Sequence, residues 1–209
     1  MSYADTPPKL VGGSLCLDLV NTVGWRGRAD DANDRLTSYE ELVHWQLHTG
    51  ALGPAELRRL LAEARRRPDD AARVLDSAIA LREAIARLLD PGARTRRADL
   101  AVLNALLSRA PTRASLVPVE AGYRWADERA AVLERPLWLV AWDAADLLTS
   151  ERRAWVRACD DSECGWMFLD LSRAKTRRWC SMEDCGNRAK ARRHQARARQ
   201  AKPSAAKRS

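Results

Sequence analysis

The stretch CDDSECGWMFLDLSRAKTRRWCSMEDCGNR, residues 159–188, contains four cysteines arranged as two pairs. Four residues separate Cys159 from Cys164 and Cys180 from Cys185, and fifteen residues separate the pairs. Two short cysteine pairs joined by a hairpin-sized spacer are typical of a structural Zn²⁺ site. Four thiolates satisfy a tetrahedral Zn²⁺ ion at Zn–S distances of about 2.3 Å. The spacing therefore predicts that these four cysteines hold one structural zinc ion.

A disulfide framework and scattered reduced thiols are the two alternatives for these cysteines. The N-terminus shows no signal-peptide pattern, and no apolar run reaches the roughly 18 residues of a membrane-spanning helix. We therefore expect a cytoplasmic protein with no membrane partner, in which structural disulfides are rare. The identical spacing of the two pairs argues against scattered thiols. The fifth cysteine, Cys16, stands alone in an apolar run and is expected to be a buried thiol.

The spacer between the two cysteine pairs predicts a hairpin. An apolar run at 166–169 is followed by a polar turn at 170–175 and by a return run that ends at Arg178 and Trp179. Cys185 then begins a segment with high helix propensity. A metal knuckle, a hairpin and a helix that carries the last ligand are the parts of a treble-clef-like finger. We expect this finger, with its basic helix, to span residues 151–202.

The positive charge of the chain is concentrated at its C-terminal end. Residues 173–209 hold 13 Lys and Arg against 2 acidic residues, a net charge of +11, whereas the rest of the chain has −3 and the whole chain +8. Residues 186–201 favour a helix but carry no large apolar stripe, so core burial cannot hold that helix. Its like-charge i,i+4 pairs, such as Arg188 with Arg192, weaken it further. The pattern predicts a helix that the metal anchors and that a polyanion stabilises.

Nucleic acid is the polyanion that this helix is expected to bind. Arg and Lys neutralise phosphates, Arg reads guanine edges in the major groove, and Asn187 can read adenine. DNA is the leading partner and RNA is the alternative. The candidate nucleic-acid contacts are Arg173, Lys175, Arg177, Arg178, Asn187, Arg188, Lys190, Arg192, Arg193 and Arg197.

Helical signals dominate residues 1–150, so the fold class is expected to be mainly α with a small β component. Ser14 precedes an apolar run that reads as a strand or as a capped helix, and we favour the helix. Thr37 and Glu40 form a capping-box pattern. Further helices are predicted from Pro54, over 70–89, over 98–109 and from Pro136, and a β-hairpin is predicted around 120–122. Residues 203–209 are expected to form a disordered tail.

Several motifs resemble those of a known bacterial family. CGNR at 185–188, within RRWCSMEDCGNRAKARRH and after CDDSECGWMFLDLSR, resembles the CGNR zinc finger, and all four cysteine positions match. GGSLCLDLVNT, SYEELVHW and PLWLVAWDAADLLTS resemble the ABATE domain that usually precedes this finger. The resemblance implies that the four cysteines are the zinc ligands. It also implies a stress-related transcription regulator whose finger binds DNA through its positive charge.

We therefore expect a zinc-dependent, DNA-binding transcription regulator rather than an enzyme. The chain carries no phosphate-binding glycine loop, dinucleotide fingerprint or nucleophile elbow. Residues 1–150 are expected to bind a small-molecule effector or to form a homodimer. The alternatives are an RNA-binding protein that uses the same finger, and a metabolite-binding enzyme or an adaptor that the finger localises.

Overall fold

The computed structural model describes residues 3–26, 33–94, 96–111, 115–119, 122–125 and 132–201. The helices are α1 (Leu15–Val20), α2 (Tyr39–His48), α3 (Pro54–Arg66), α4 (Pro68–Leu89), α5 (Arg97–Arg109), α6 (Arg135–Thr149) and α7 (Asn187–Ala201), with a 3₁₀ turn at Glu151–Trp155 and a π turn at Met182–Gly186. The strands are β1 (Val23–Gly24), β2 (Asn33–Asp34), β3 (Leu116–Val119), β4 (Gly122–Trp125), β5 (Val156–Ala158) and β6 (Met167–Leu169). The mainly α fold class with a small β component is confirmed. None of the described helices is both long enough and apolar enough to cross a bilayer.

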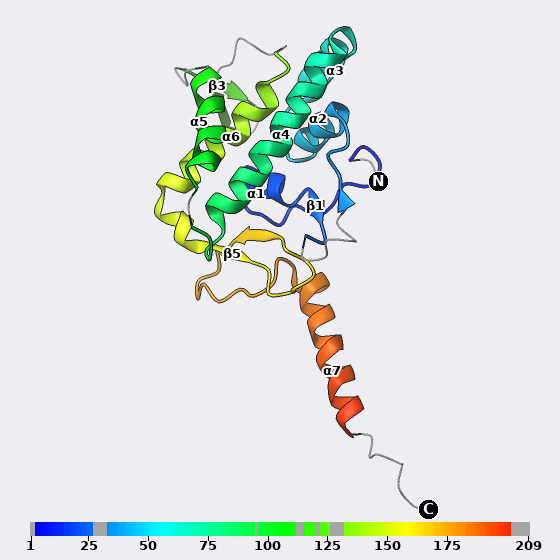
Figure 1. Cartoon of the computed structure of the whole chain (residues 1–209). Helices are drawn as coiled ribbons and strands as arrows, with labels where there is room; N and C mark the ends of the chain where they lie inside the picture. Colours follow the sequence, from blue (N-terminus) through cyan, green and yellow to red (C-terminus); the bar gives the residue numbers. More distant parts are fainter. Residues whose placement is uncertain are drawn as a thin grey trace, which may run out of the picture.

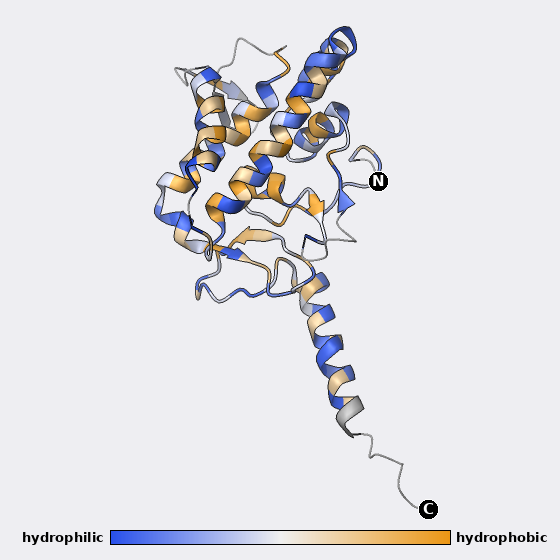
Figure 2. Ribbon diagram, in the orientation of Figure 1, coloured by the Kyte–Doolittle hydropathy of each residue, from blue (hydrophilic) through white to orange (hydrophobic). Residues whose placement is uncertain are grey.

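Helix α4 forms the centre of the helical body. It packs against α1, α2, α3, α5 and α6 (Figure 1). Leu81 and Ile85 of α4 are fully buried, and so are Leu17, Leu42 and Leu137 of the helices around it. The apolar sides of these helices face one another, while their hydrophilic sides face outward (Figure 2). Burial of this kind contributes about 25 cal/mol per Å² of apolar surface and holds the body together.

Helix α3 begins at the residue predicted from the sequence, whereas the N-cap of α2 lies one residue later than predicted. Pro54 is the first residue of α3, as predicted. Helix α2 is capped by Ser38, whose side chain accepts a hydrogen bond from the backbone N–H of Glu41 at 3.2 Å. The predicted capping box of Thr37 and Glu40 was therefore wrong by one residue. Thr37 with Glu40 and Ser38 with Glu41 both fit the sequence pattern, and the structure places Ser38 at the N-cap.

The ambiguous segment after Ser14 forms helix α1, as we favoured from the sequence. Ser14 occupies the N-cap position, but its side chain makes no capping hydrogen bond. Its hydroxyl instead donates to Asp143 of α6, which also accepts from the backbone N–H of Cys16 at 2.8 Å. Cys16 is fully buried, as predicted, and burial raises the pKa of its thiol. Asp143 thus joins the start of α1 to α6.

The predicted β-hairpin near residue 120 is formed by β3 and β4, which pair antiparallel with Val119 opposite Gly122. Glu120 and Ala121, which connect the two strands, lie outside the described residues. The predicted disordered tail at 203–209 also lies outside them.

The strand pair near the cysteines differs from the sequence prediction. Strand β6 pairs with β5, which precedes the first cysteine pair, and Arg157 lies opposite Phe168. The predicted partner was the return run before Cys180. That run contributes only single contacts, such as the hydrogen bond of 2.8 Å from Asp160 N–H to Arg178 C=O. Strand β5 supplies the buried Val156, whereas the return run is polar and exposed, so burial favours β5.

The β5–β6 hairpin belongs to the same hydrophobic core as the helical body. Val156, Met167 and Leu169 are buried in one cluster with residues of α1, α4 and α6. In Figure 1 the hairpin lies directly below α1 and α4, and α7 leads away from it. The expected boundary near residue 150 therefore lies between two sections of chain that are packed against each other.

Asn21 forms a buried polar connection between these two sections. Its side-chain amide donates to the C=O of Met167 at 2.8 Å, and its side-chain oxygen accepts from the N–H of Met167 at 2.9 Å. These bonds satisfy two backbone groups of β6 that are otherwise buried without partners.

Asn21→Ala should lower the free energy of unfolding by about 2–5 kcal/mol, because it leaves the N–H and C=O of Met167 unpaired in the core. Urea unfolding followed by circular dichroism measures this loss. Asn104→Ala, at an exposed position of α5, is the matched control and should change stability by less than about 0.5 kcal/mol. An Asn21→Ala protein as stable as this control would contradict the role of Asn21.

Gly12 forms a second connection between the body and the hairpin. Its N–H donates to a side-chain oxygen of Asp18 at 2.8 Å, and its C=O accepts from the N–H of Leu169 at 2.8 Å. A Cβ atom on Gly12 would lie 2.8 Å from the backbone nitrogen of Asp18, so a larger residue cannot fit without displacing α1. Burial raises the pKa of Asp18 to about 6.

Asp18→Asn should therefore stabilise the protein above pH 6, by about 1–3 kcal/mol at pH 8. The folded-state pKa lies above the unfolded-state value, so the cost of burying the carboxylate grows between about pH 4 and pH 6 and remains above it. Urea unfolding of both proteins at several pH values should show the difference shrinking as the pH falls to about 4. Asp76→Asn, on the exposed face of α4, is the control. A difference that is the same at pH 8 and near pH 4 would refute the prediction.

Candidate metal centre and basic helix

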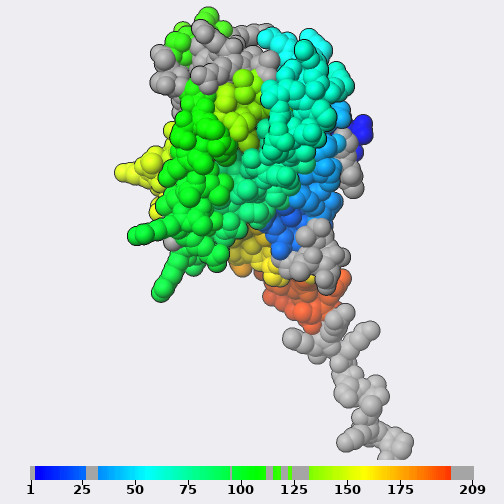
Figure 3. All heavy atoms as spheres, turned by 45° about the horizontal axis from the view of Figure 1, so that its top comes forward, coloured from blue at the N-terminus to red at the C-terminus, as the bar shows by residue number. Residues whose placement is uncertain are grey.

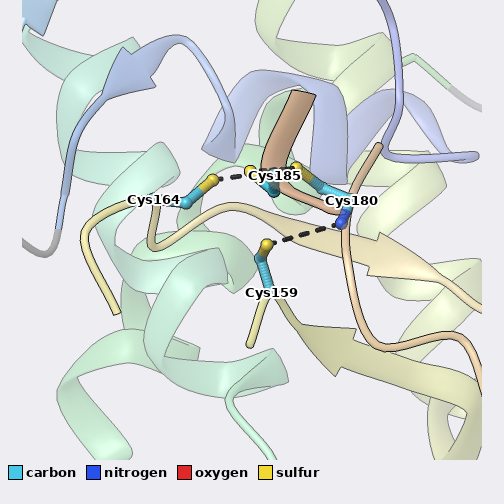
Figure 4. Close-up of side chains that lie close together, drawn as sticks. All are labelled: Cys159, Cys164, Cys180 and Cys185. Carbon is cyan, nitrogen blue, oxygen red and sulfur yellow. Dashed lines mark hydrogen bonds between the residues drawn. The ribbon is translucent and has the colours of Figure 1, made fainter. Parts of the chain in front are cut away.

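The fold brings together all four cysteines that the sequence singled out. Cys159 follows β5, Cys164 lies in the loop before β6, Cys180 ends the return run, and Cys185 lies in the π turn before α7. Their side chains point toward a common centre (Figure 4). All four are buried, and their sulfur atoms lie within 4.8 Å of one another.

The geometry of these sulfur atoms fits a tetrahedral metal ion. The Sγ atoms of Cys164 and Cys180 are 3.7 Å apart, and those of Cys180 and Cys185 are 3.5 Å apart. Four ligands at about 2.3 Å from Zn²⁺ would lie about 3.8 Å from one another. A disulfide requires about 2.05 Å, and all five cysteines of the chain are free. The donor set therefore matches a four-thiolate metal site and excludes the disulfide alternative.

The close approach of the four sulfur atoms couples the titration of the thiols and calls for a compensating cation. Hydrogen bonds with Cys164 and Cys180 lower the pKa of Cys159 to about 2. The hydrogen bond to Cys159 raises the pKa of Cys180 far above that of a free thiol. Four adjacent thiolates would repel one another strongly. A divalent ion is the group that would allow all four thiols to deprotonate.

Aromatic side chains pack around the metal centre. Phe168 is fully buried among the four cysteines, and Trp166 and Trp179 pack against the cluster. Trp166 also donates its indole N–H to the C=O of Val23 at 2.8 Å. The metal centre is therefore tied to the segment that follows α1.

Two arginines join the start of α7 to the loop between Cys159 and Cys164. Arg188 donates to Cys185 Sγ at 2.8 Å and to Asp161 at 3.1 Å. Arg192, one turn later, pairs with the other oxygen of Asp161 at 3.0 Å. The side chain of Asp161 is fully buried; burial raises its pKa, but the hydrogen bonds from the two arginines outweigh this effect and lower it. Asp161 was missed in the sequence analysis, although an acid within a cysteine knuckle that precedes a basic helix is a signal for such a pair.

Arg188 also offsets the charge of the metal centre. Its guanidinium donates to a ligand sulfur, and four thiolates around a divalent ion carry a formal −2. The centre lies at the N-terminal end of α7, where the helix dipole favours negative charge. Within the CGNR segment at 185–188, Cys185 therefore supplies a ligand sulfur and Arg188 donates a hydrogen bond to that sulfur. Asn187 donates to the C=O of Glu183 at 2.9 Å, which closes the π turn.

Six of the ten predicted nucleic-acid residues make contacts within the protein. Three of them, Asn187, Arg188 and Arg192, have been described above. Lys175 donates to the C=O of Asp170, and its ammonium lies 3.9 Å from the ring centroid of Trp155. Arg177 donates to the C=O of Trp179 and stacks on Phe168, and Arg178 forms an ion pair with Asp160. The remaining four, Arg173, Lys190, Arg193 and Arg197, are exposed and have no ion-pair partner within the described part of the chain.

The free basic residues of α7 share one face of the helix. Lys190, Arg193 and Arg197 are spaced three and four residues apart and therefore lie on one side. Arg188 and Arg192 lie on the opposite side, at about half a turn from Lys190. Figure 3 shows α7 standing out from the body, and Figure 2 shows no continuous hydrophobic stripe along it. One face of the helix is thus anchored at its base, and the other is open to solvent.

The helical body and the four-cysteine site define a helical protein with a metal-binding finger. Comparison with known protein families supports this class. A family model for the CGNR zinc finger matches residues 155–198. The ABATE model, described as "Putative stress-induced transcription regulator", matches residues 13–151, more than half of the chain. The chain therefore belongs to the ABATE family and carries a CGNR zinc finger, so the resemblance seen in the sequence is confirmed. No curated protein shows significant similarity to the chain.

Proposed function

We propose that the protein is a zinc-dependent, DNA-binding transcription regulator. The observation that carries the proposal is the open face of α7, where Lys190, Arg193 and Arg197 project from a helix whose base is fixed to the metal centre. Zn²⁺ bound by Cys159, Cys164, Cys180 and Cys185 would neutralise the thiolates and hold the knuckle, the hairpin and the start of α7 together.

The open face suits a nucleic-acid backbone. Each turn of a helix advances 5.4 Å, so three cations along one face follow a row of phosphates over about two turns. Arg173, on the exposed return run of the finger, adds a fourth cation. In this proposal Arg173, Lys190, Arg193 and Arg197 contact the DNA. The six predicted residues that have contacts within the protein position the finger.

The test is a titration of fluorescently labelled duplex DNA with the zinc-loaded full-length chain, followed by anisotropy at several salt concentrations. Three or four phosphate contacts should give a log–log salt slope between about −3 and −4. Removing zinc with a chelator should abolish binding. Unlabelled duplex DNA and RNA of equal length then compete at one salt concentration. A preference for RNA would favour the alternative partner, and binding that ignores salt or zinc would refute the proposal.

A further inference from the structure

A cavity of about 310 Å³ lies beside the metal centre, between the finger and the segments next to α1 and α2. The finger contributes Trp166, Arg188 and edges of the ligand cysteines, and the N-terminal part contributes Lys9, Trp25 and Arg35. Its volume is that of a site for a small molecule of one or two rings. The cavity includes the space at the ligand cysteines Cys164, Cys180 and Cys185, which a bound zinc ion would share, and the open face of α7 does not line it.

Two tryptophans form the apolar walls of the cavity. Trp25 is 37% exposed, and the guanidinium of Arg188 lies 4.8 Å from its ring centroid. The backbone of Trp25 has φ 57°, a left-handed conformation that is an outlier for a bulky side chain. Strained conformations of this kind persist where the surrounding structure enforces them, often at ligand sites. Trp166 is held in place by its hydrogen bond to Val23.

Cations and anions both line the cavity, because the zinc-loaded centre at Cys164, Cys180 and Cys185 carries a formal −2. Lys9, Arg35 and Arg188 face one carboxylate, that of Asp184. Lys9 is engaged with Glu183 at 2.5 Å and with Asp184 at 3.7 Å, and Arg188 is engaged with Asp161. Within the described parts of the chain, the side chain of Arg35 makes one long hydrogen bond, of 3.4 Å to the C=O of Thr6, and no ion pair. Arg35 is therefore the cation with most capacity for an added anion.

We propose that this cavity binds a small aromatic carboxylate, with its ring between Trp25 and Trp166 and its carboxylate on Arg35. The tryptophan walls select a flat ring, and a guanidinium selects a planar carboxylate through paired hydrogen bonds. The proposal does not depend on DNA binding.

Isothermal titration of the zinc-loaded full-length chain with benzoate and indole-3-acetate, in the absence of nucleic acid, tests the proposal. At least one of these probes should bind with a Kd below about 1 mM. Benzamide, which lacks the charge, and acetate, which lacks the ring, should bind at least about tenfold more weakly. No binding of either aromatic carboxylate up to about 10 mM would overturn the proposal.

Two variants locate the binding site. Arg35→Gln should weaken binding of the aromatic carboxylate at least about tenfold, and Trp25→Leu should do the same by removing one wall. Arg94→Gln, at an exposed position that does not line the cavity, is the matched control and should bind like the wild type. Zinc content confirms that each variant keeps the finger folded. Equal affinities of Arg35→Gln and Arg94→Gln would place the ligand elsewhere and overturn the assignment.

Discussion

Replacing Cys180 with serine should yield a chain that loses its zinc on dialysis against a chelator, whereas the wild type should keep close to one zinc ion per chain. Structural zinc sites have apparent binding free energies of about 10–16 kcal/mol, and this free energy folds the surrounding segment. A serine hydroxyl does not supply a thiolate. Cys180 lies 3.7 Å and 3.5 Å from two of the other ligand sulfurs, so its loss opens the centre on both sides.

Elemental analysis of the purified protein measures the zinc content, and near-ultraviolet circular dichroism reports on Trp166 and Trp179 beside the centre. Cys16→Ala is the matched control, because it removes a buried thiol that lies outside the cluster. It should keep the zinc ion. A Cys180→Ser protein with the same zinc content as the Cys16→Ala protein would refute the assignment of the metal centre.

Replacing Lys190, Arg193 and Arg197 together with alanine should weaken DNA binding by about two orders of magnitude at low salt and reduce the magnitude of the salt slope by about 3. These side chains are exposed, and no ion pair to a described carboxylate competes with phosphate. Alanine favours the helix and removes like-charge repulsion, so α7 should persist. Zinc content should also be unchanged.

The matched control removes the same charge elsewhere. Arg58, Arg59 and Arg66 are exposed on α3, at the end of the body opposite α7 (Figure 1). Their joint replacement with alanine lowers the net charge by the same amount but should leave the salt slope unchanged. Equal effects of the two triple variants would mean that net charge, and not the open face of α7, determines binding.

The parts of the structure that the sequence predicted best depend on local chemistry. The cysteine spacing indicated the metal centre because a tetrahedral ion needs four thiolates at short separations. The helix starting at Pro54 was predictable because proline at a first position and a run of apolar residues at helical spacing act within one segment.

The parts that it did not predict depend on contacts between distant segments. The pairing of β6 with β5 was missed because the apolar run at 166–169 fits either neighbour, and the buried Val156 decides between them. The internal contacts of Arg188 and Arg192 were missed because a basic run has the same composition whether or not a buried carboxylate such as Asp161 lies beneath it.

The hydrophobic core shared by the β5–β6 hairpin and the helices limits how this finger can be transplanted. A graft of residues 155–198 onto an unrelated protein would expose Val156, Met167 and Leu169 to water and would lose the partners of Met167 and Leu169 at Asn21 and Gly12. A working chimaera therefore has to include the surface of α1 as well, which makes the region around α1 part of the minimal unit that can be exchanged.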